Sequence, residues 1–438
     1  MVAVNTKKER KKAQTLILCD FDGTVSLKDT VNRLIRSHLF DPEWRYHVKR
    51  YLRGNTGSKG VYEALAPMMR MNQDDLNQFV SEHAELDPHF PEFLDWARSR
   101  EIDVKIVSDG FDATIKTLFA KHGVDGLDIF ANGLHFVEND RVEISNPYSN
   151  PECGVCGTCK LSILKSFRDR YNKIILIGDG ESDRHAASEA DMVLALKDLF
   201  IYCARNDIPA IRMKSFQEAS SLLTRRIQAV AFDLDGTLIE SLEAIAEAFN
   251  HMFATLGYPS MTVDEVIRKT GVSLIDFVRS YLKPEEADLG IKIFRDYYDT
   301  IFLEKTTMFP GAAEALERLN GSRKTGIVTN KRGKYARILA DHLGFSEKME
   351  LIIGAEDGFK AKPHADMFVE FMKTAGVSEH ATVYVGDAPI DIHGAKAARI
   401  DAFALANRFY SAEELALHKP RRVLRSISEL PDALEPLV

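Results

Sequence analysis

The stretch that decides the fold is LILCDFDGT, at residues 16–24. Its leading apolar run is typical of a buried strand, and the strand ends at a carboxylate. A second carboxylate follows two positions later, and Gly-Thr then turns the backbone away. Open α/β sheets bind their ligands at the carboxyl ends of their strands. We therefore expect Asp20 and Asp22 to lie in a functional site.

The same pattern returns as AVAFDLDGT at residues 229–237. Its first carboxylate, Asp233, follows Asp20 by 213 residues, close to half of the 438-residue chain. Matching signals follow each copy in the same order. The two stretches therefore indicate a duplicated catalytic module.

Composition excludes several classes of function. The chain is 45% hydrophobic and 28% charged, which is typical of a globular protein with more than one core. Its formal net charge of −8 argues against nucleic-acid binding, because no excess of Lys and Arg is present to neutralise phosphates. No run of about 18 apolar residues predicts a membrane span. The apolar run behind the basic N-terminus is too short for a signal peptide, and five cysteines make no disulfide framework at this length, so we expect a cytoplasmic protein.

Strand and helix patterns alternate through both halves. Buried-strand patterns recur at residues 104–107, 174–177, 192–196 and 210–213, and again at 325–329, 351–354, 382–386, 403–405 and 422–427. Such alternation implies parallel sheets with right-handed crossovers. The expected fold class is α/β, with two doubly wound parallel-sheet, Rossmann-like cores in tandem.

Two long helical stretches interrupt the alternation. Residues 27–98 and 240–306 show helix spacing without a confident strand, so we expect each to form a helical cap inserted after the first strand of its module. The seam lies at residues 224–226, directly before the second motif strand. We expect modules at residues 1–218 and 225–438. Because the linker between them is short and has no Pro/Gly/Ser run, we expect them to pack on each other.

Each half supplies the same polar residues in the same order: an Asp-x-Asp pair, a strand-end hydroxyl, a lysine and a second pair of acids. The two sets are Asp20, Asp22, Ser108, Lys160, Asp179 and Asp183, and Asp233, Asp235, Thr329, Lys362, Asp387 and Asp391. Phosphoryl transfer through a covalent intermediate needs a carboxylate nucleophile, a second acid for proton transfer, and cations to balance charge. A carboxylate cluster with open water positions suits Mg²⁺. The expected ligands are small phosphorylated metabolites.

These motifs resemble those of phosphatases of the haloacid dehalogenase superfamily, over nearly the whole chain. The resemblance implies that Asp20 and Asp233 are nucleophiles and that Asp22 and Asp235 are general acid/base residues. It implies phosphate binding by Ser108, Lys160, Thr329 and Lys362. It also implies Mg²⁺ bound by Asp20, Asp22, Asp179, Asp183, Asp233, Asp235, Asp387 and Asp391.

Each half is similar to a different branch of the superfamily. The first is similar to the phosphoserine-phosphatase-like branch, and within it to enzymes that dephosphorylate 2-hydroxy-3-keto-5-methylthiopentenyl-1-phosphate. Those enzymes usually carry Ser-Gly-Gly where this chain has Ser108-Asp109-Gly110. The second half is similar to phosphoglycolate phosphatase, through FPG at residues 309–311, VTNK at 328–331, KPH at 362–364 and VGD at 385–387.

Three alternatives stay open. One module could be a non-catalytic domain that binds a metabolite and regulates or scaffolds the other. The second module shares much of its pattern with β-phosphoglucomutase and could be a phosphomutase. Cys153, Cys156 and Cys159 have metal-ligand spacing but no obvious fourth cysteine, so reduced loop thiols are the simpler interpretation.

Overall fold

The computed structural model describes residues 13–39, 42–53, 55–269 and 273–438. The chain divides into two compact units, with the boundary between Leu223 and Thr224, and Val438 belonging to the first unit. Each unit contains its own sheet, so that each has the components of an independent domain.

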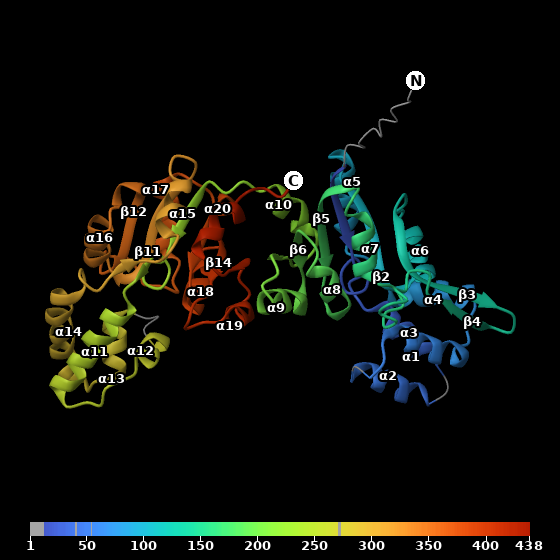
Figure 1. The fold of residues 1–438 in the computed structure, drawn as a ribbon, viewed down its shortest axis with the longest axis horizontal. Helices are drawn as coiled ribbons and strands as arrows, with labels where there is room; N and C mark the ends of the chain where they lie inside the picture. Colours follow the sequence, from blue (N-terminus) through green and yellow to red (C-terminus); the bar gives the residue numbers. More distant parts are fainter. Residues whose placement is uncertain (1–12, 40–41, 54, 270–272) are drawn as a thin grey trace, which may run out of the picture. The chain divides into compact units, whose positions relative to one another are not determined.

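The first unit is built on a seven-stranded sheet with the order β4-β3-β2-β1-β5-β6-β7 (Figure 1). Every neighbouring pair is parallel except β3 and β4. The strands are β1 (Ala13–Cys19), β2 (Asp103–Phe111), β3 (Asp128–Val137), β4 (Arg141–Ser145), β5 (Tyr171–Gly178), β6 (Met192–Ala195) and β7 (Ala210–Arg212). The largely parallel sheet confirms the predicted fold class. β1 lies between β2 and β5 with its apolar run fully buried, which explains why that run is continuous rather than alternating.

Helices of the first unit fall into a group before β2 and a group that alternates with the later strands. They are α1 (Thr30–His38), α2 (Trp44–Leu52), α3 (Ser58–Leu65), α4 (Gln73–His83), α5 (Phe90–Ser99), α6 (Asp112–Lys121), α7 (Lys160–Phe167), α8 (Arg184–Ala187), α9 (Lys197–Arg205) and α10 (Ala219–Thr224). The interval expected to form a cap is helical. Its last helix, α5, packs against β2 and places Phe90 and Phe93 against Phe216, so it belongs to the core.

The second unit repeats the plan with a six-stranded, fully parallel sheet in the order β12-β11-β8-β13-β14-β15. These strands are β8 (Ala229–Phe232), β11 (Lys324–Arg332), β12 (Met349–Ala355), β13 (Thr382–Gly386), β14 (Asp401–Leu405) and β15 (Arg422–Leu424). The predicted strand at 422–427 is too long, because Ser426 caps a 3₁₀ turn at Ile427–Glu429 and ends the extended backbone.

The cap of the second unit lies between two short strands. β9 (Ile239–Glu240) and β10 (Thr307–Met308) pair antiparallel, and they bracket α11 (Leu242–Leu256), α12 (Val263–Lys269), α13 (Leu274–Tyr281) and α14 (Ala287–Ile301). Strands of two residues leave no period to detect, so the sequence did not predict this ribbon. Gly257 ends α11 in the left-handed conformation (φ 76°), which glycine adopts without a steric penalty.

The sheet of the second unit separates two hydrophobic clusters. Along β8, Val230 and Phe232 face the cluster shared with the cap, whereas Ala229 and Ala231 face the other. The second cluster is covered by α17 (Asp366–Ala375) and α18 (Pro389–Ala397). The remaining helices of this unit are α15 (Ala312–Leu319), α16 (Gly333–His342), α19 (Ala412–Leu417) and α20 (Leu430–Ala433). Burial on both faces therefore accounts for the uninterrupted apolar pattern of the motif strand.

In each sheet the connection reverses direction beside the motif strand. From β1 the chain runs outward to β2 and β3, and it then returns to β5 on the other side of β1. From β8 it runs to β11 and β12 and then returns to β13. Ligands of such sheets bind at the carboxyl ends of the strands where the order reverses. Both Asp-x-Asp pairs lie at this point.

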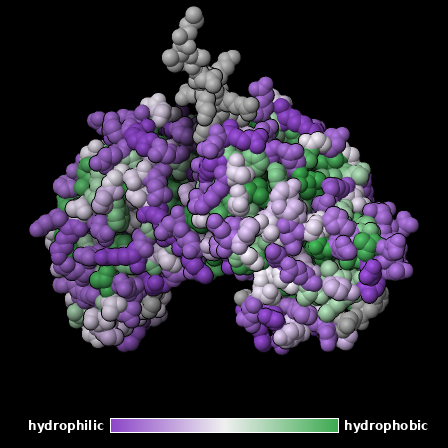
Figure 2. All heavy atoms as spheres, turned by 45° about the vertical axis from the view of Figure 1, so that its right-hand side comes forward, coloured by the Kyte–Doolittle hydropathy of each residue, from purple (hydrophilic) through white to green (hydrophobic). Residues whose placement is uncertain are grey.

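The face of the molecule in Figure 2 is largely hydrophilic, with hydrophobic residues in separate groups. No helix among the described residues is both long enough and apolar enough to cross a membrane. The apolar residues that do line up along the helices are accounted for by the cores described above.

Replacing Phe90 by alanine is expected to destabilise the first unit by about 3 to 5 kcal/mol, because its fully buried ring packs against Phe216 and Phe119. Urea unfolding followed by tryptophan fluorescence would measure this, since Trp44 and Trp96 both belong to the first unit. Asp95→Ala, at an exposed position of the same helix, is the matched control and should cost less than about 0.5 kcal/mol. Equal effects of the two changes would contradict the packing described here.

Two candidate active sites

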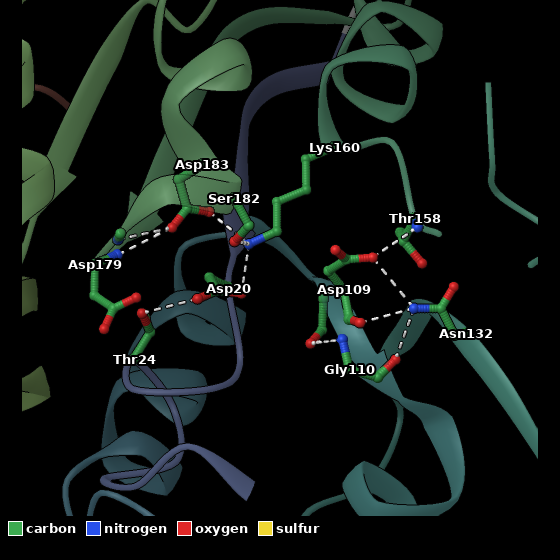
Figure 3. Close-up of polar contacts among 12 residues, drawn as sticks. Asp20, Thr24, Asp109, Gly110, Asn132, Thr158, Lys160, Asp179, Ser182 and Asp183 are labelled. Carbon is green, nitrogen blue, oxygen red and sulfur yellow. Dashed lines mark hydrogen bonds and ion pairs between the residues drawn. The ribbon is translucent and has the colours of Figure 1, made fainter. Parts of the chain in front are cut away.

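The first site forms where β1 ends beside β5. The backbone N–H of Asp20 donates to the carbonyl of Ile177 (2.8 Å), which continues the pairing of the two strands by one residue. Lys160, the first residue of α7, is buried, and its Nζ donates to Asp20 Oδ1 (2.5 Å) and Asp183 Oδ1 (2.6 Å) (Figure 3). One lysine thus joins the predicted nucleophile to an acid from the turn that follows β5.

The other carboxylates of this site come from the turn after β5. Asp183 Oδ2 accepts from the backbone N–H groups of Asp179 (3.1 Å) and Gly180 (3.3 Å), which orients it toward the site. Carboxylate oxygens of Asp20, Asp179 and Asp183 all lie within 4.8 Å of one another. This spacing permits the three acids to share one cation.

Ser108 lies near the end of β2, and its buried Oγ accepts from the backbone N–H of Gly110 (2.9 Å). Asp109, which replaces the glycine expected from the resemblance, is not a member of the acidic triad. Its Oδ1 accepts from the backbone N–H of Thr158 (2.9 Å), and its carbonyl accepts from the Tyr62 hydroxyl (2.7 Å). Burial raises the pKa of its carboxyl. Asp109 therefore ties β2 to the cap helix α3 and to the loop that precedes α7.

The second site repeats this arrangement. The backbone N–H of Asp233 donates to Val385 on β13 (2.8 Å). The Nζ of Lys362 lies 2.9 Å from Asp233 Oδ1 and 2.7 Å from Asp391 Oδ1. Carboxylate oxygens of Asp233, Asp387 and Asp391 lie within 4.8 Å of one another. The two modules therefore present equivalent acidic triads, each with a buried lysine.

Thr329 is the counterpart of Ser108. It is buried on β11, and its Oγ1 accepts from the backbone N–H of Lys331 (3.2 Å), two residues later. The twelve predicted site residues thus gather at the two carboxyl edges, one set per unit.

The side chains of Asp22 and Asp235 lie outside the two acidic triads. Asp22 Oδ1 accepts from the backbone N–H and the hydroxyl of Thr30 (both 2.6 Å), at the start of α1. Asp235 Oδ1 accepts from Ser241, next to α11, and from Lys331 Nζ (2.8 Å). Donors at the beginning of each cap turn these carboxylates away from the metal-binding geometry. In each module the orientation of this carboxylate is thus fixed by residues at the start of the cap.

The three clustered cysteines belong to neither triad. Among the described residues, the groups of His, Cys, Asp and Glu with ligand atoms close enough to share a metal ion are the two acidic triads. Cys153, Cys156 and Cys159 are free, and they range from exposed to buried. The interpretation as loop thiols therefore fits the structure better than a metal site.

Each site holds more acid than base. Four carboxylates and two lysine ammonium groups meet there, which leaves a formal excess of two negative charges. The groups are Asp20, Asp22, Asp179, Asp183, Lys160 and Lys197 in the first site, and Asp233, Asp235, Asp387, Asp391, Lys362 and Lys331 in the second. Burying an ionic cluster with unbalanced charge is costly. A divalent cation held by each triad would remove the imbalance, and hard carboxylate oxygens are the ligands that Mg²⁺ prefers.

The imbalance also appears in the protonation equilibria. Burial, followed by the charge of Asp183, raises the pKa of Asp20 well above its usual range. Burial, followed by the charge of Asp391, does the same for the pKa of Asp387. Burial opposes the charge of Lys160, but Asp183 and Asp20 outweigh burial and raise the pKa of its ammonium group. Burial likewise opposes the charge of Lys362, but Asp233 and Asp391 outweigh it and raise the pKa of its ammonium group. Lys160 and Lys362 therefore stay charged, and the excess negative charge lies on the acids.

Two residues of the sites were missed by sequence reasoning. Lys197 Nζ donates to Asp179 Oδ2 (2.7 Å), and Asn407 Nδ2 donates to Asp387 Oδ2 (2.8 Å). Each stands two positions after the strand that follows its acid pair, β6 in the first unit and β14 in the second. A polar residue at that offset in both halves was the signal that could have revealed them.

Gly236→Ala is expected to lower turnover at the second site about a hundredfold, because a Cβ there would lie 2.4 Å from Asp387 Oδ2 and displace that carboxylate. Gly321→Ala is the matched control: its φ is similarly positive (74°, against 82° at Gly236), but nothing lies within 4 Å of the added Cβ. It should cost only the strain of the left-handed conformation, about 1 to 2 kcal/mol of stability. Initial rates and thermal unfolding of both variants separate the two effects, and unchanged turnover in Gly236→Ala would contradict the geometry of the triad.

Comparison with known proteins agrees with this geometry. Residues 17–188 and, separately, residues 230–405 match the family described as haloacid dehalogenase-like hydrolase. Phosphoglycolate phosphatase from Chromobacterium violaceum is 30% identical over 220 residues, which cover 48% of this chain and 98% of that enzyme. This chain belongs to the haloacid dehalogenase-like hydrolases. It carries two modules of that family in tandem.

Further similar proteins are another phosphoglycolate phosphatase and a haloacid dehalogenase-like hydrolase. Phosphoglycolate phosphatase from Salmonella choleraesuis is 28% identical over 235 residues, 48% of this chain and 93% of that enzyme. A solved haloacid dehalogenase-like hydrolase from Streptococcus pneumoniae is 27% identical, with a TM-score of 0.44, and the match covers 48% of this chain and 99% of that one. As a member of this family with phosphoglycolate phosphatases among its relatives, the tandem chain is a phosphatase.

Proposed function

We propose that both modules hydrolyse phosphate monoesters of small metabolites through an aspartyl-phosphate, and that each requires Mg²⁺. The observation that carries the proposal is the presence of a complete set of groups at each site: a strand-end aspartate, a buried lysine on it, and an acidic triad with excess negative charge. Neither set lacks a member, which favours two active modules over one active and one regulatory module.

Asp20 and Asp233 would act as nucleophiles. Each carboxylate would attack the phosphorus of the ester, so that a bond from phosphorus to the aspartate forms while the bond to the alcohol oxygen breaks. Lys160 and Lys362, already within 2.5 to 2.9 Å of these aspartates, would neutralise charge on the transferring group. Ser108 and Thr329 would donate hydrogen bonds to its oxygens.

Asp22 and Asp235 would transfer the protons. In its own module, each would protonate the departing alcohol oxygen and then take a proton from the water that attacks the aspartyl-phosphate. That attack releases inorganic phosphate and restores the aspartate. Burial, followed by the charge of Asp29, raises the pKa of Asp22 to about 7. At neutral pH a fraction of the protein molecules therefore carries a proton on this carboxyl. The contacts with Thr30 and Ser241 keep both acids clear of the triads.

The triads would hold the metal ion. Asp20, Asp179 and Asp183 would bind it in the first module, and Asp233, Asp387 and Asp391 would bind it in the second. When bound, Mg²⁺ would supply positive charge to the oxygens of the transferring phosphoryl group.

A structure of the full chain with Mg²⁺ and beryllium fluoride tests the proposal, because this fluoride occupies the position of the phosphoryl group on a nucleophilic carboxylate. We expect it bonded to Asp20 and to Asp233, with a cation held by each triad. Two bare aspartates would contradict the proposed mechanism. Fluoride on one aspartate alone would contradict dual activity and support the interpretation in which one module regulates or scaffolds the other.

A further inference from the structure

A cavity of about 270 Å³ opens directly onto the second site. On the core side it is lined by Asp233, Asp235, Thr329 and Lys362. On the opposite side it is lined by three cap helices, α11, α13 and α14. An ester whose phosphorus lies at Asp233 has its organic part in this cavity, because core and cap enclose the site between them. The chemistry of the cap wall therefore decides which organic parts bind.

The described part of the cap wall is mostly apolar, with Ser273 and Tyr298 as its polar residues. Leu242, Ile245 and Phe249 line the cavity from one face of α11, since they are three and four residues apart. The other two helices contribute Leu274, Ile275, Phe277 and Phe294. The ring of Phe249 packs 4.2 Å from that of Phe277 and 4.5 Å from that of Phe294, between centroids. These contacts make the wall a packed aromatic surface that exists before substrate binds.

The cations that line the cavity are already paired with carboxylates. Among the described residues of the lining they are Lys331, Arg332 and Lys362. Lys331 Nζ lies 2.8 Å from Asp235, and Arg332 Nε lies 2.8 Å from Glu356, a carboxylate that it shares with Arg295. Lys362 belongs to the triad. The described cap residues of the lining include no lysine or arginine, so a substrate carboxylate placed against the cap wall would lose its water without gaining a cation there, which is costly.

The first site has a larger cavity, about 420 Å³. Its cap contributes apolar residues, among them Val31, Ile35 and Val61, but also the polar residues Asp29, Asn32 and Ser58. Its core side adds Asp109, Glu181 and Lys197 to the acids of the site. The first cavity is therefore the more polar of the two.

We infer that the second module prefers phosphate monoesters whose organic part is uncharged and apolar, such as a short alkyl or aryl group, and discriminates against phosphoglycolate. This inference rests on the phosphatase mechanism proposed above and specifies its substrate class. Each methylene that enters the cavity leaves water for an apolar wall, which corresponds to about a fourfold gain in kcat/KM.

The test uses the full chain with Asp20→Asn, so that phosphate release reports the second site. The substrates are ethyl, butyl and hexyl phosphate, whose alcohols leave equally well, together with phosphoglycolate. We expect kcat/KM to rise about fourfold per methylene until the cavity is full, and to be at least about tenfold lower for phosphoglycolate than for butyl phosphate. A flat alkyl series, or a preference for phosphoglycolate, would overturn the inference while leaving the phosphatase mechanism intact.

Variants of the cap wall test whether the organic part of the ester lies in the cavity. Ile245→Ser should lower kcat/KM for hexyl phosphate about tenfold, mainly through KM, with a smaller effect on ethyl phosphate. Ile293→Ser is the matched control, because Ile293 is also half-buried in the cap but does not line the cavity. It should leave kcat/KM unchanged for both hexyl and ethyl phosphate. Equal losses for all esters in Ile245→Ser would overturn the inference. Failure of every ester to release phosphate would instead contradict the proposed function, and the inference with it.

Discussion

Replacing Asp233 by asparagine is expected to abolish turnover at the second site, by about four orders of magnitude or more, and to leave turnover at the first site unchanged. The amide keeps the shape of the side chain and its place beside Lys362, but it lacks the anionic oxygen that would attack phosphorus. Asp20→Asn should produce the reverse pattern. Initial rates of phosphate release from a panel of phosphorylated metabolites, measured for each single variant and for the double variant, would check this.

The pattern of losses separates the open alternatives. If either single replacement removes all turnover, then one module carries the activity and dual catalysis is wrong. If Asp233→Asn stops the transfer of phosphate to a second hydroxyl of the same substrate, rather than its release into solution, then the second module is a phosphomutase. Phosphate released by the double variant at the rate of the unmodified chain would contradict both nucleophiles.

Removal of divalent metal with EDTA is expected to lower the activity of both modules by about three orders of magnitude, and added Mg²⁺ should restore it. The physical reason is the formal excess of two negative charges at each site, which has no other counter-charge among the described residues of the two clusters. Activity assays before and after chelation, with each nucleophile variant used to isolate the other site, would measure the loss.

Thermal unfolding gives an independent readout of the same binding. A cation that binds only the folded chain stabilises it by about 2.7 kcal/mol at a hundred times its Kd. Asp387→Asn removes one member of the second triad and should reduce this Mg²⁺-dependent increase in Tm, whereas Asp341→Asn, at an exposed acid on α16, should not. An equal increase in Tm for both variants would contradict the placement of the ion in the triad.

Much of each core followed from local patterns. β1 and β8 are buried between neighbouring strands on both sides, so their runs are continuously apolar and easy to recognise. Very short strands have too few residues to show a period. The β9–β10 ribbon was therefore not predicted, and β15 was predicted too long.

The orientation of individual acids did not follow from local patterns. The resemblance implies that Asp22 and Asp235 join the metal ligands. In the fold, Thr30 and Ser241 at the starts of the caps turn them away. A donor supplied by a packed helix cannot be recognised from the spacing of the acids alone.

The sequence by itself determined that two strands end in paired aspartates and that a hydroxyl, a lysine and two more acids follow each in the same order. Order along the chain is sufficient for this, because parallel strands bring their carboxyl ends to one edge. Only the tertiary structure decided that Lys197 and Asn407 complete the sites, and that Ile245 and Phe249 form an apolar wall above Asp233. The contacts of Lys197 and Asn407 depend on the order of the strands in each sheet, whereas the apolar wall depends on how the cap packs on the core.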